Sequence, residues 1–263
     1  MVSRLKNIFN QFQICYTITG SWRQSLRFIL TGNGTGTFAI RFKNKKIYLR
    51  KKTTDKEVFF DTFYHGYHRS TVDIGAFPVI IDMGSNIGLT IIDFAIQYPG
   101  ATIIGVEADF DNYSICKNNI SDLPNCTITH AAVWKADTQV YCGGKDAQSI
   151  FIQKNPDDTH FQKIRGVSIN TLLTENSISQ VDYLKMDIEG SEYPVLLDPS
   201  DKNWLNNVKF ISVEVHDTPE ISKEEGIKLL IEELEKNNFM VKKSKNHWSS
   251  FFAINKSFTS NGI

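Results

Sequence analysis

The sequence predicts an α/β fold in which helices cover both faces of a mainly parallel β-sheet. Short runs that are almost entirely apolar, such as 79–81 and Val181–Met186, alternate with stretches of helical periodicity such as 89–98. A strand that is apolar on both faces is typical of a parallel sheet covered by crossover helices. Near the C-terminus, the runs Phe239–Lys243 and 249–254 flank a polar turn and predict a hairpin on this sheet.

Residues 1–75 predict an N-terminal elaboration that precedes the main domain, residues 76–263. Weak helical periodicity leads into a glycine-rich turn or linker at 31–36. The alternating runs Thr37–Phe42 and 46–50 predict a β-hairpin, and a helix is expected soon after it. The elaboration is therefore expected to be helical and hairpin-like.

In the main domain, strands and helices alternate along the chain. Strands are expected at 79–81, 101–106, 126–133, Val181–Met186 and 210–215, and helices at 89–98, 109–119 and 223–237. Pro99 and Gly100 end the first of these helices. This order of elements is that of a sheet built from crossover units.

The composition is that of an ordinary globular protein, with 263 residues, 41% hydrophobic residues, and 29 basic and 29 acidic side chains. Zero net charge argues against a general nucleic-acid binder, so we expect no nucleic-acid partner. No run reaches the roughly 18 apolar residues of a membrane span, and the N-terminus lacks the apolar core of a signal peptide. Four cysteines without C-x-x-C spacing suit reduced thiols, and we expect a soluble, cytoplasmic protein.

A glycine turn joins the first main-domain strand to its helix, in the sequence Ile81-Asp82-Met83-Gly84-Ser85-Asn86-Ile87-Gly88. Because Gly84 and Gly88 lack a Cβ atom, a ligand can approach the backbone there, close to the free N–H groups of the helix N-terminus. A carboxylate at Asp82 would repel a pyrophosphate, but it suits a ligand that carries an ammonium group. The alternative is that both glycines only form a tight turn.

The second strand ends at Glu107, about twenty residues further on, where a carboxylate can accept hydrogen bonds from both hydroxyls of a ribose. The turn and Glu107 outline a site for a nucleoside with an amino-acid-like tail, which fits S-adenosyl-L-methionine (SAM). Neither the Gly-Lys-Ser/Thr of a P-loop nor the Gly-x-Gly-x-x-Gly of dinucleotide-binding folds is present. The predicted cofactor-binding residues are Asp82, Gly84, Ser85, Asn86, Gly88 and Glu107.

A second candidate segment, Asp187-Ile188-Glu189-Gly190-Ser191-Glu192, follows the strand Val181–Met186. That strand delivers Asp187 to the carboxyl edge of the sheet, where open α/β folds bind ligands. If the strand that ends at Glu214 is its neighbour, Glu214 and His216 face the same pocket. Methyl transfer often needs a base that takes the acceptor's proton, and Asp187, Glu189 and His216 are the predicted catalytic residues.

Other interpretations of this segment remain open. Asp187, Glu214 and His216 form a candidate site for a divalent metal that would acidify a sugar hydroxyl. Alternatively, Glu189 and Glu192 only cap a helix, and His216 only ends a strand.

Seven basic residues and no acidic residue occupy the twelve positions 41–52. Such a run can contact a phosphorylated glycan, a nucleotide-sugar or an anionic lipid surface. More often it is the solvated face of an edge hairpin, where lysines also prevent edge-to-edge pairing.

These segments together resemble the FkbM-type family of SAM-dependent methyltransferases. The resemblance rests on the glycine turn, Val106-Glu107, the strand end at 131–133, the run Lys185-Met186-Asp187-Ile188-Glu189-Gly190-Ser191-Glu192, and Glu214-Val215-His216. It implies a Rossmann-like class I methyltransferase fold of seven strands, the last antiparallel. It also implies O-methylation, usually of a hydroxyl on a sugar or natural product, and hence a small-molecule or glycan acceptor.

Two further functions are compatible with the sequence. One is a non-catalytic module with the same fold that binds a partner through its N-terminal elaboration. The other is a methyltransferase whose acceptor is a peptide or a lipid.

Overall fold

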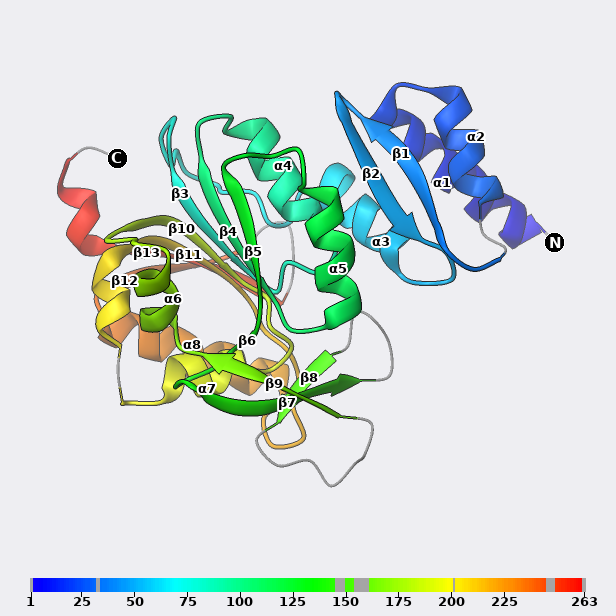
Figure 1. Cartoon of the computed structure of the whole chain (residues 1–263). Helices are drawn as coiled ribbons and strands as arrows, with labels where there is room; N and C mark the ends of the chain where they lie inside the picture. The colour runs from blue at the N-terminus through cyan, green and yellow to red at the C-terminus, as the bar shows by residue number, and fades with distance from the viewer. Residues whose placement is uncertain are drawn as a thin grey trace.

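The computed structural model describes residues 2–31, 34–144, 150–153, 161–200, 202–244 and 249–261. A seven-stranded sheet in the order β12-β13-β11-β10-β3-β4-β5 forms its centre (Figure 1). The strands are β3 (Val79–Met83), β4 (Thr102–Glu107), β5 (Cys126–His130), β10 (Val181–Met186), β11 (Val208–Glu214), β12 (Phe239–Lys243) and β13 (Ser250–Asn255). All pairings are parallel except those of β13, which is antiparallel to both of its neighbours. The predicted fold, with seven strands and an antiparallel last strand, is confirmed.

Helices cover both faces of this sheet, because successive side chains of each strand point to opposite faces. Ile81 and Leu184 belong to a buried cluster on one face, whereas Ile80 and Tyr183 belong to a cluster on the other. The first cluster includes side chains of α6 (Ile169–Glu175), α7 (Glu192–Leu197) and α8 (Lys223–Lys236). The second includes side chains of α4 (Leu89–Gln97) and α5 (Phe110–Asn119).

The N-terminal segment packs on the α4–α5 side of the sheet (Figure 1). Its elements are α1 (Val2–Thr19), α2 (Trp22–Leu30), the predicted hairpin β1 (Thr37–Phe42) and β2 (Lys45–Arg50), α3 (Asp55–Phe60) and a π-helical turn, η1 (Asp61–His65). Phe28, Leu49 and Phe59 share one buried cluster with Phe94 of α4. Arg50 adds a polar link, since it pairs with Asp55 and donates a hydrogen bond from Nη2 to Asn112 Oδ1 of α5 (2.7 Å).

A second, four-stranded sheet was not predicted. Its order is β6 (Ala132–Val133), β9 (Gln162–Val167), β7 (Thr138–Gly144) and β8 (Ile150–Gln153). The single strand expected at 126–133 is wrong, because the chain leaves the central sheet at Ala131 and β6 pairs with β9 instead. Two short 3₁₀ helices, η2 (Asn203–Asn207) and η3 (Lys256–Asn261), complete the structure. Within the described residues, no helix has both the length and the hydropathy needed to cross a membrane.

Replacing Asp55 with alanine should lower the free energy of unfolding by about 3 kcal/mol, because the Arg50 guanidinium would lose its buried partner. The two groups are 2.8 Å apart, and the Asp55 side chain is 1% exposed. Urea denaturation followed by circular dichroism measures the change. Asp122→Ala is the control: it removes the exposed Lys45–Asp122 pair and should cost less than about 1 kcal/mol. Equal losses in the two variants would contradict the role of Arg50.

Candidate active site

A cavity of about 610 Å³ opens at the carboxyl ends of β3, β4, β10 and β11. It brings together most of the residues predicted from the two sequence segments, namely Gly84, Ser85, Asn86, Glu107, Asp187, Glu189, Glu214 and His216. The parallel order β11-β10-β3-β4 explains this arrangement, since it places these four strand ends side by side.

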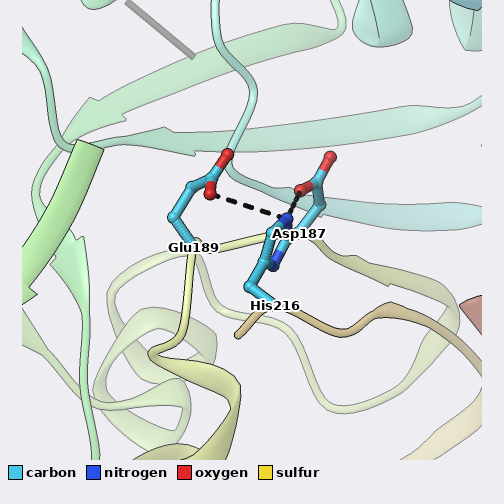
Figure 2. Close-up of side chains that lie close together, drawn as sticks. All are labelled: Asp187, Glu189 and His216. Atoms are coloured by element: carbon cyan, nitrogen blue, oxygen red, sulfur yellow. Dashed lines mark ion pairs between the residues drawn. The ribbon is translucent and has the colours of Figure 1, made fainter. Parts of the chain in front are cut away.

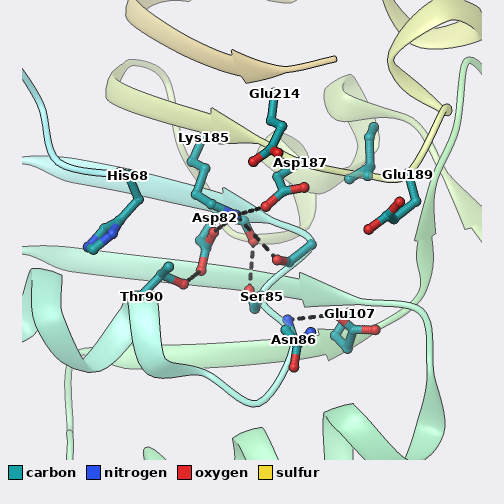
Figure 3. A network of polar contacts seen from close by, with 12 residues as sticks. His68, Asp82, Ser85, Asn86, Thr90, Glu107, Lys185, Asp187, Glu189 and Glu214 are labelled. Carbon is teal, nitrogen blue, oxygen red and sulfur yellow. Dashed lines mark hydrogen bonds and ion pairs between the residues drawn. The ribbon is translucent and has the colours of Figure 1, made fainter. Parts of the chain in front are cut away.

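Glu107 is held at the end of β4 by backbone groups from two different elements. The N–H of Asn86 in the glycine turn donates to Glu107 Oε2 (2.7 Å; Figure 3), and the N–H of Asp109, just before α5, donates to Oε1 (2.9 Å). Burial raises the pKa of Glu107 to about 7, although these two hydrogen bonds lower it. The Asn112 side chain also hydrogen-bonds this carboxylate, whose roughly four acceptor sites exceed these three bonds, so capacity remains for a ribose hydroxyl.

The two glycines of the turn are required by packing as well as by backbone conformation. Gly84 has φ +80°, and a Cβ atom there would lie 1.8 Å from the carbonyl oxygen of Asp187. Gly88 has φ +81°, and its Cβ would lie 2.7 Å from Cys116 Sγ of α5. Gly84 lines the cavity, but the direct reason for glycine at both positions is close contact with protein.

The ammonium group expected opposite Asp82 is that of Lys185. Asp82 is fully buried, and the backbone register places it beside Lys185 on the neighbouring strand. Lys185 Nζ lies 3.2 Å from Asp82 Oδ1, 3.2 Å from Asp187 Oδ2 and 3.3 Å from the carbonyl oxygen of Gly84 (Figure 3). Thr90 also donates a hydrogen bond to the Asp82 carboxylate. Asp82 therefore supports the turn from inside the protein, through Lys185 and Thr90. Gly84, Ser85 and Asn86 line the cavity.

Lys185 remains charged although it is only 3% exposed. Burial lowers its pKa, but the Asp187 and Asp82 carboxylates outweigh burial and raise the pKa well above its ordinary value. The sequence motifs predicted no role for this residue. The available signal was a lysine near the carboxyl end of a strand whose neighbouring residues Tyr183, Leu184 and Met186 are apolar, because a charge in such a place needs a buried partner.

The second loop surrounds His216, whose imidazole faces three carboxylates. His216 Nε2 lies 3.6 Å from both Asp187 Oδ1 and Glu189 Oε2 (Figure 2), and Nδ1 lies 2.9 Å from Glu192 Oε1. Glu192 is fully buried and also accepts hydrogen bonds from the N–H groups of Ile188 (2.9 Å) and Gly190 (2.7 Å). Glu192 thus shapes the loop and orients His216, which exceeds the capping role considered from the sequence.

This cluster keeps His216 protonated at neutral pH. Burial lowers the pKa of His216, but the hydrogen bond with Glu192 and the charges of Glu192, Asp187 and Glu189 raise it to about 10. An imidazolium cannot accept a proton, so among the three predicted bases His216 is the least suited. Burial raises the pKa of Glu189 to about 8, against the opposing effect of His216, and that of Glu214 to about 7.

The same atoms have the spacing of a metal site. One ligand atom each from Asp187, Glu189 and His216 lies within 4.8 Å of the others. In this trio Glu189 takes the place of Glu214 in the predicted metal set. A metal ion at His216 Nε2 would replace the proton that gives His216 its positive charge. The metal-bound form and the ion pairs of His216 with Asp187 and Glu189 therefore exclude each other.

The N-terminal segment contributes cavity residues that were not predicted from the sequence. Val58 of α3, Asp61 and His65 of η1, and Tyr67 line the cavity together with the two main-domain loops. No motif marks these positions, because their place at the cavity follows from the docking of η1 against α4.

Comparison with known proteins decides the family. The sequence model of the family described as methyltransferase FkbM domain matches residues 82–241, which is more than half of the chain. The chain belongs to the FkbM methyltransferase family. This confirms the predicted resemblance, makes the protein a methyltransferase, and decides against the non-catalytic module.

Individual relatives are distant. The chain is 24% identical over 203 residues to Methyltransferase 1 of Beauveria bassiana, covering 66% of this chain and 78% of that protein. Among solved structures, the FkbM methyltransferase of Methylobacillus flagellatus aligns with 11% identity and a TM-score of 0.48, over 96% of this chain and 60% of that one. Aeropyrum pernix fibrillarin aligns with 14% identity and a TM-score of 0.42, over 85% of each chain.

Lys185→Met should reduce the free energy of unfolding by about 3–5 kcal/mol, because Asp82 would keep a buried charge without its counter-ion. Adding Asp82→Asn in the same chain should recover part of this loss. Urea denaturation of the single and double variants measures both effects. Lys209→Met is the control, since the Lys209 side chain is 31% exposed in its pair with Asp182. A single variant as stable as the wild type would refute the role assigned to Lys185.

Proposed function

We propose that this methyltransferase transfers the methyl group of SAM to a hydroxyl of a sugar, a glycoconjugate or a natural product. Family membership supports methyl transfer. The finer proposal is carried by one observation: a single cavity is bounded by the glycine turn and Glu107 on one side, and by Asp187 and Glu189 on the other.

The turn side of the cavity fits the nucleoside part of SAM. Glu107 would accept hydrogen bonds from the ribose hydroxyls, while the main chain from Gly84 to Asn86 forms the adjoining wall. Alanine and valine side chains at 131–133 give an apolar wall suited to adenine. Asp82 and Gly88 would support this site indirectly, through Lys185 and Cys116. When bound, SAM supplies an electrophilic methyl group on a sulfonium centre.

The loop side of the cavity supplies acidic groups suited to a hydroxyl acceptor. We assign the proton acceptor to Glu189, which lines the cavity and lies in the ion-pair cluster of His216. With a pKa of about 8, the Glu189 carboxyl can take a proton from a hydroxyl only in its ionised form, whose fraction grows as the pH rises through 8, whereas His216 with a pKa of about 10 stays protonated there. Asp187, held by Lys185, is assigned to hydrogen bonding of the acceptor. His216 is assigned to holding both carboxylates in place as a cation.

A divalent ion is the alternative at this place. It would bind Asp187, Glu189 and the deprotonated His216, and it would acidify the acceptor hydroxyl. Loss of turnover with EDTA and its recovery with Mg²⁺ or Mn²⁺ would favour this alternative over direct proton transfer to Glu189.

Glu107→Gln should weaken SAM binding by about 1–3 kcal/mol, because the ribose hydroxyls would lose a charged acceptor. In the wild type, affinity should rise as the pH passes through about 7, since the carboxylate then becomes ionised. The variant should lack this rise. Equilibrium dialysis with labelled SAM from pH 6 to 8 measures both effects. Unchanged affinity in the variant would exclude Glu107 as the ribose-binding residue.

Glu189→Gln should lower kcat by about 10²–10⁴-fold while SAM affinity stays unchanged, because the variant cannot take the acceptor's proton. Transfer of labelled methyl groups to a panel of sugars and other alcohols provides the assay. Glu224→Gln, on the exposed side of α8, is the matched control and should retain full turnover. Transfer only to peptide or lipid amines would contradict the proposed hydroxyl acceptor.

A further inference from the structure

The zero net charge of the chain conceals a strong separation of charge. Residues 1–54 contain 11 basic side chains and no acidic one, so residues 55–263 contain 18 basic and 29 acidic side chains. The basic part comprises α1, α2 and the β1–β2 hairpin, and the structure therefore has a basic N-terminal lobe beside an acidic main body. Figure 1 shows α1 and α2 at one end of the molecule, with the C-terminal strands toward the other end.

The same lobe carries most of the large apolar side chains that are exposed in the described residues. Of the ten large apolar side chains that are exposed in the described residues, six lie in α1 and α2: Ile8, Phe9, Tyr16, Trp22, Leu26 and Leu30. Single exposed apolar residues are normal on a protein surface, but several of them on one face indicate an interaction site. The enrichment is a property of these two helices within the described residues.

Helix α2 presents this apolar surface as a regular stripe. Trp22, Leu26 and Leu30 are four residues apart, which places them on one helix face, and they are 57%, 44% and 72% exposed. The opposite face is buried through Phe28, whose ring packs 5.5 Å from that of Phe59. The stripe is thus not needed for the attachment of α2 to the rest of the structure.

Basic side chains run parallel to the stripe. Arg23 and Arg27, one position further along, are both exposed, and the Arg23 guanidinium lies 5.4 Å from the centre of the Trp22 ring. A helix with an apolar face of Trp and Leu beside arginines is typical of segments that lie in the interface of a membrane.

We propose that the basic N-terminal lobe binds, through α1 and α2, the surface of a membrane that contains anionic lipid. Trp22, Leu26 and Leu30 enter the boundary between headgroups and acyl chains, and Arg23 and Arg27 pair with lipid phosphates and carboxylates. The opposite charges of lobe and main body orient the molecule with the lobe toward the membrane. The exposed aliphatic side chains favour lipid over nucleic acid, because leucine has no counterpart on a phosphate backbone. This inference is independent of the proposed acceptor.

Co-sedimentation of the full chain with vesicles tests the proposal. The protein should bind vesicles of phosphatidylcholine with phosphatidylserine, bind pure phosphatidylcholine weakly, and lose binding as salt is raised. Arg23→Gln with Arg27→Gln should lower the partition coefficient about 25-fold, at roughly a factor of five for each arginine. Trp22→Ser with Leu26→Ser and Leu30→Ser should lower it about tenfold or more.

Matched variants outside the lobe provide the controls. Lys228→Gln with Lys236→Gln on α8, and Phe77→Ser at a side chain that is 82% exposed, should leave vesicle binding unchanged. Absence of binding to anionic vesicles would overturn the proposal, as would equal effects of lobe and control variants. Binding of single-stranded RNA in place of vesicles, or burial of Trp22 in a dimer, would also overturn it.

Discussion

The buried ammonium group of Lys185 is the interaction on which both halves of the active site depend. It lies between the Asp82 and Asp187 carboxylates, and it also approaches the carbonyl oxygen of Gly84. One cation thereby joins the turn after β3 to the loop after β10. Gly84 lets the two loops lie in direct contact, since any Cβ atom at this position would collide with the carbonyl oxygen of Asp187. The contact between the two loops is thus fixed by charge and by shape.

A second buried charge organises the outer part of the cavity. Glu192 accepts two backbone hydrogen bonds from its own loop and holds His216 by Nδ1. The imidazole in turn lies between Asp187 and Glu189. These residues form an acidic wall of the cavity that contains the His216 imidazolium, and this wall lies opposite the glycine turn and Glu107. In the proposed reaction, the glycine turn and Glu107 bind the cofactor, and the acidic wall positions the acceptor.

The sequence predicts the central fold and which strand ends meet at the cavity, because strand ends of a parallel sheet meet at one edge. Asp187, Glu189, Glu214 and His216 could be grouped on that basis alone. The direction of a side chain is less predictable: Asp82 faces Lys185 beneath the turn and does not line the cavity. The charge of His216 depends on Glu192, whose side chain turns back toward its own loop at Ile188 and meets His216 there. No sequence pattern predicts this direction of the side chain. The sheet of β6, β9, β7 and β8 escaped prediction because strands such as β9, with the sequence Gln-Lys-Ile-Arg-Gly-Val, lack a clear apolar pattern.

Calorimetric titration of the purified chain with SAM, with and without EDTA, tests the central claim most directly. The account predicts saturable binding of one SAM per chain, unchanged by EDTA, because in the proposed site the turn and Glu107 would hold the cofactor without a metal ion. Absence of binding by a folded, monodisperse sample would contradict the cofactor site between the glycine turn and Glu107.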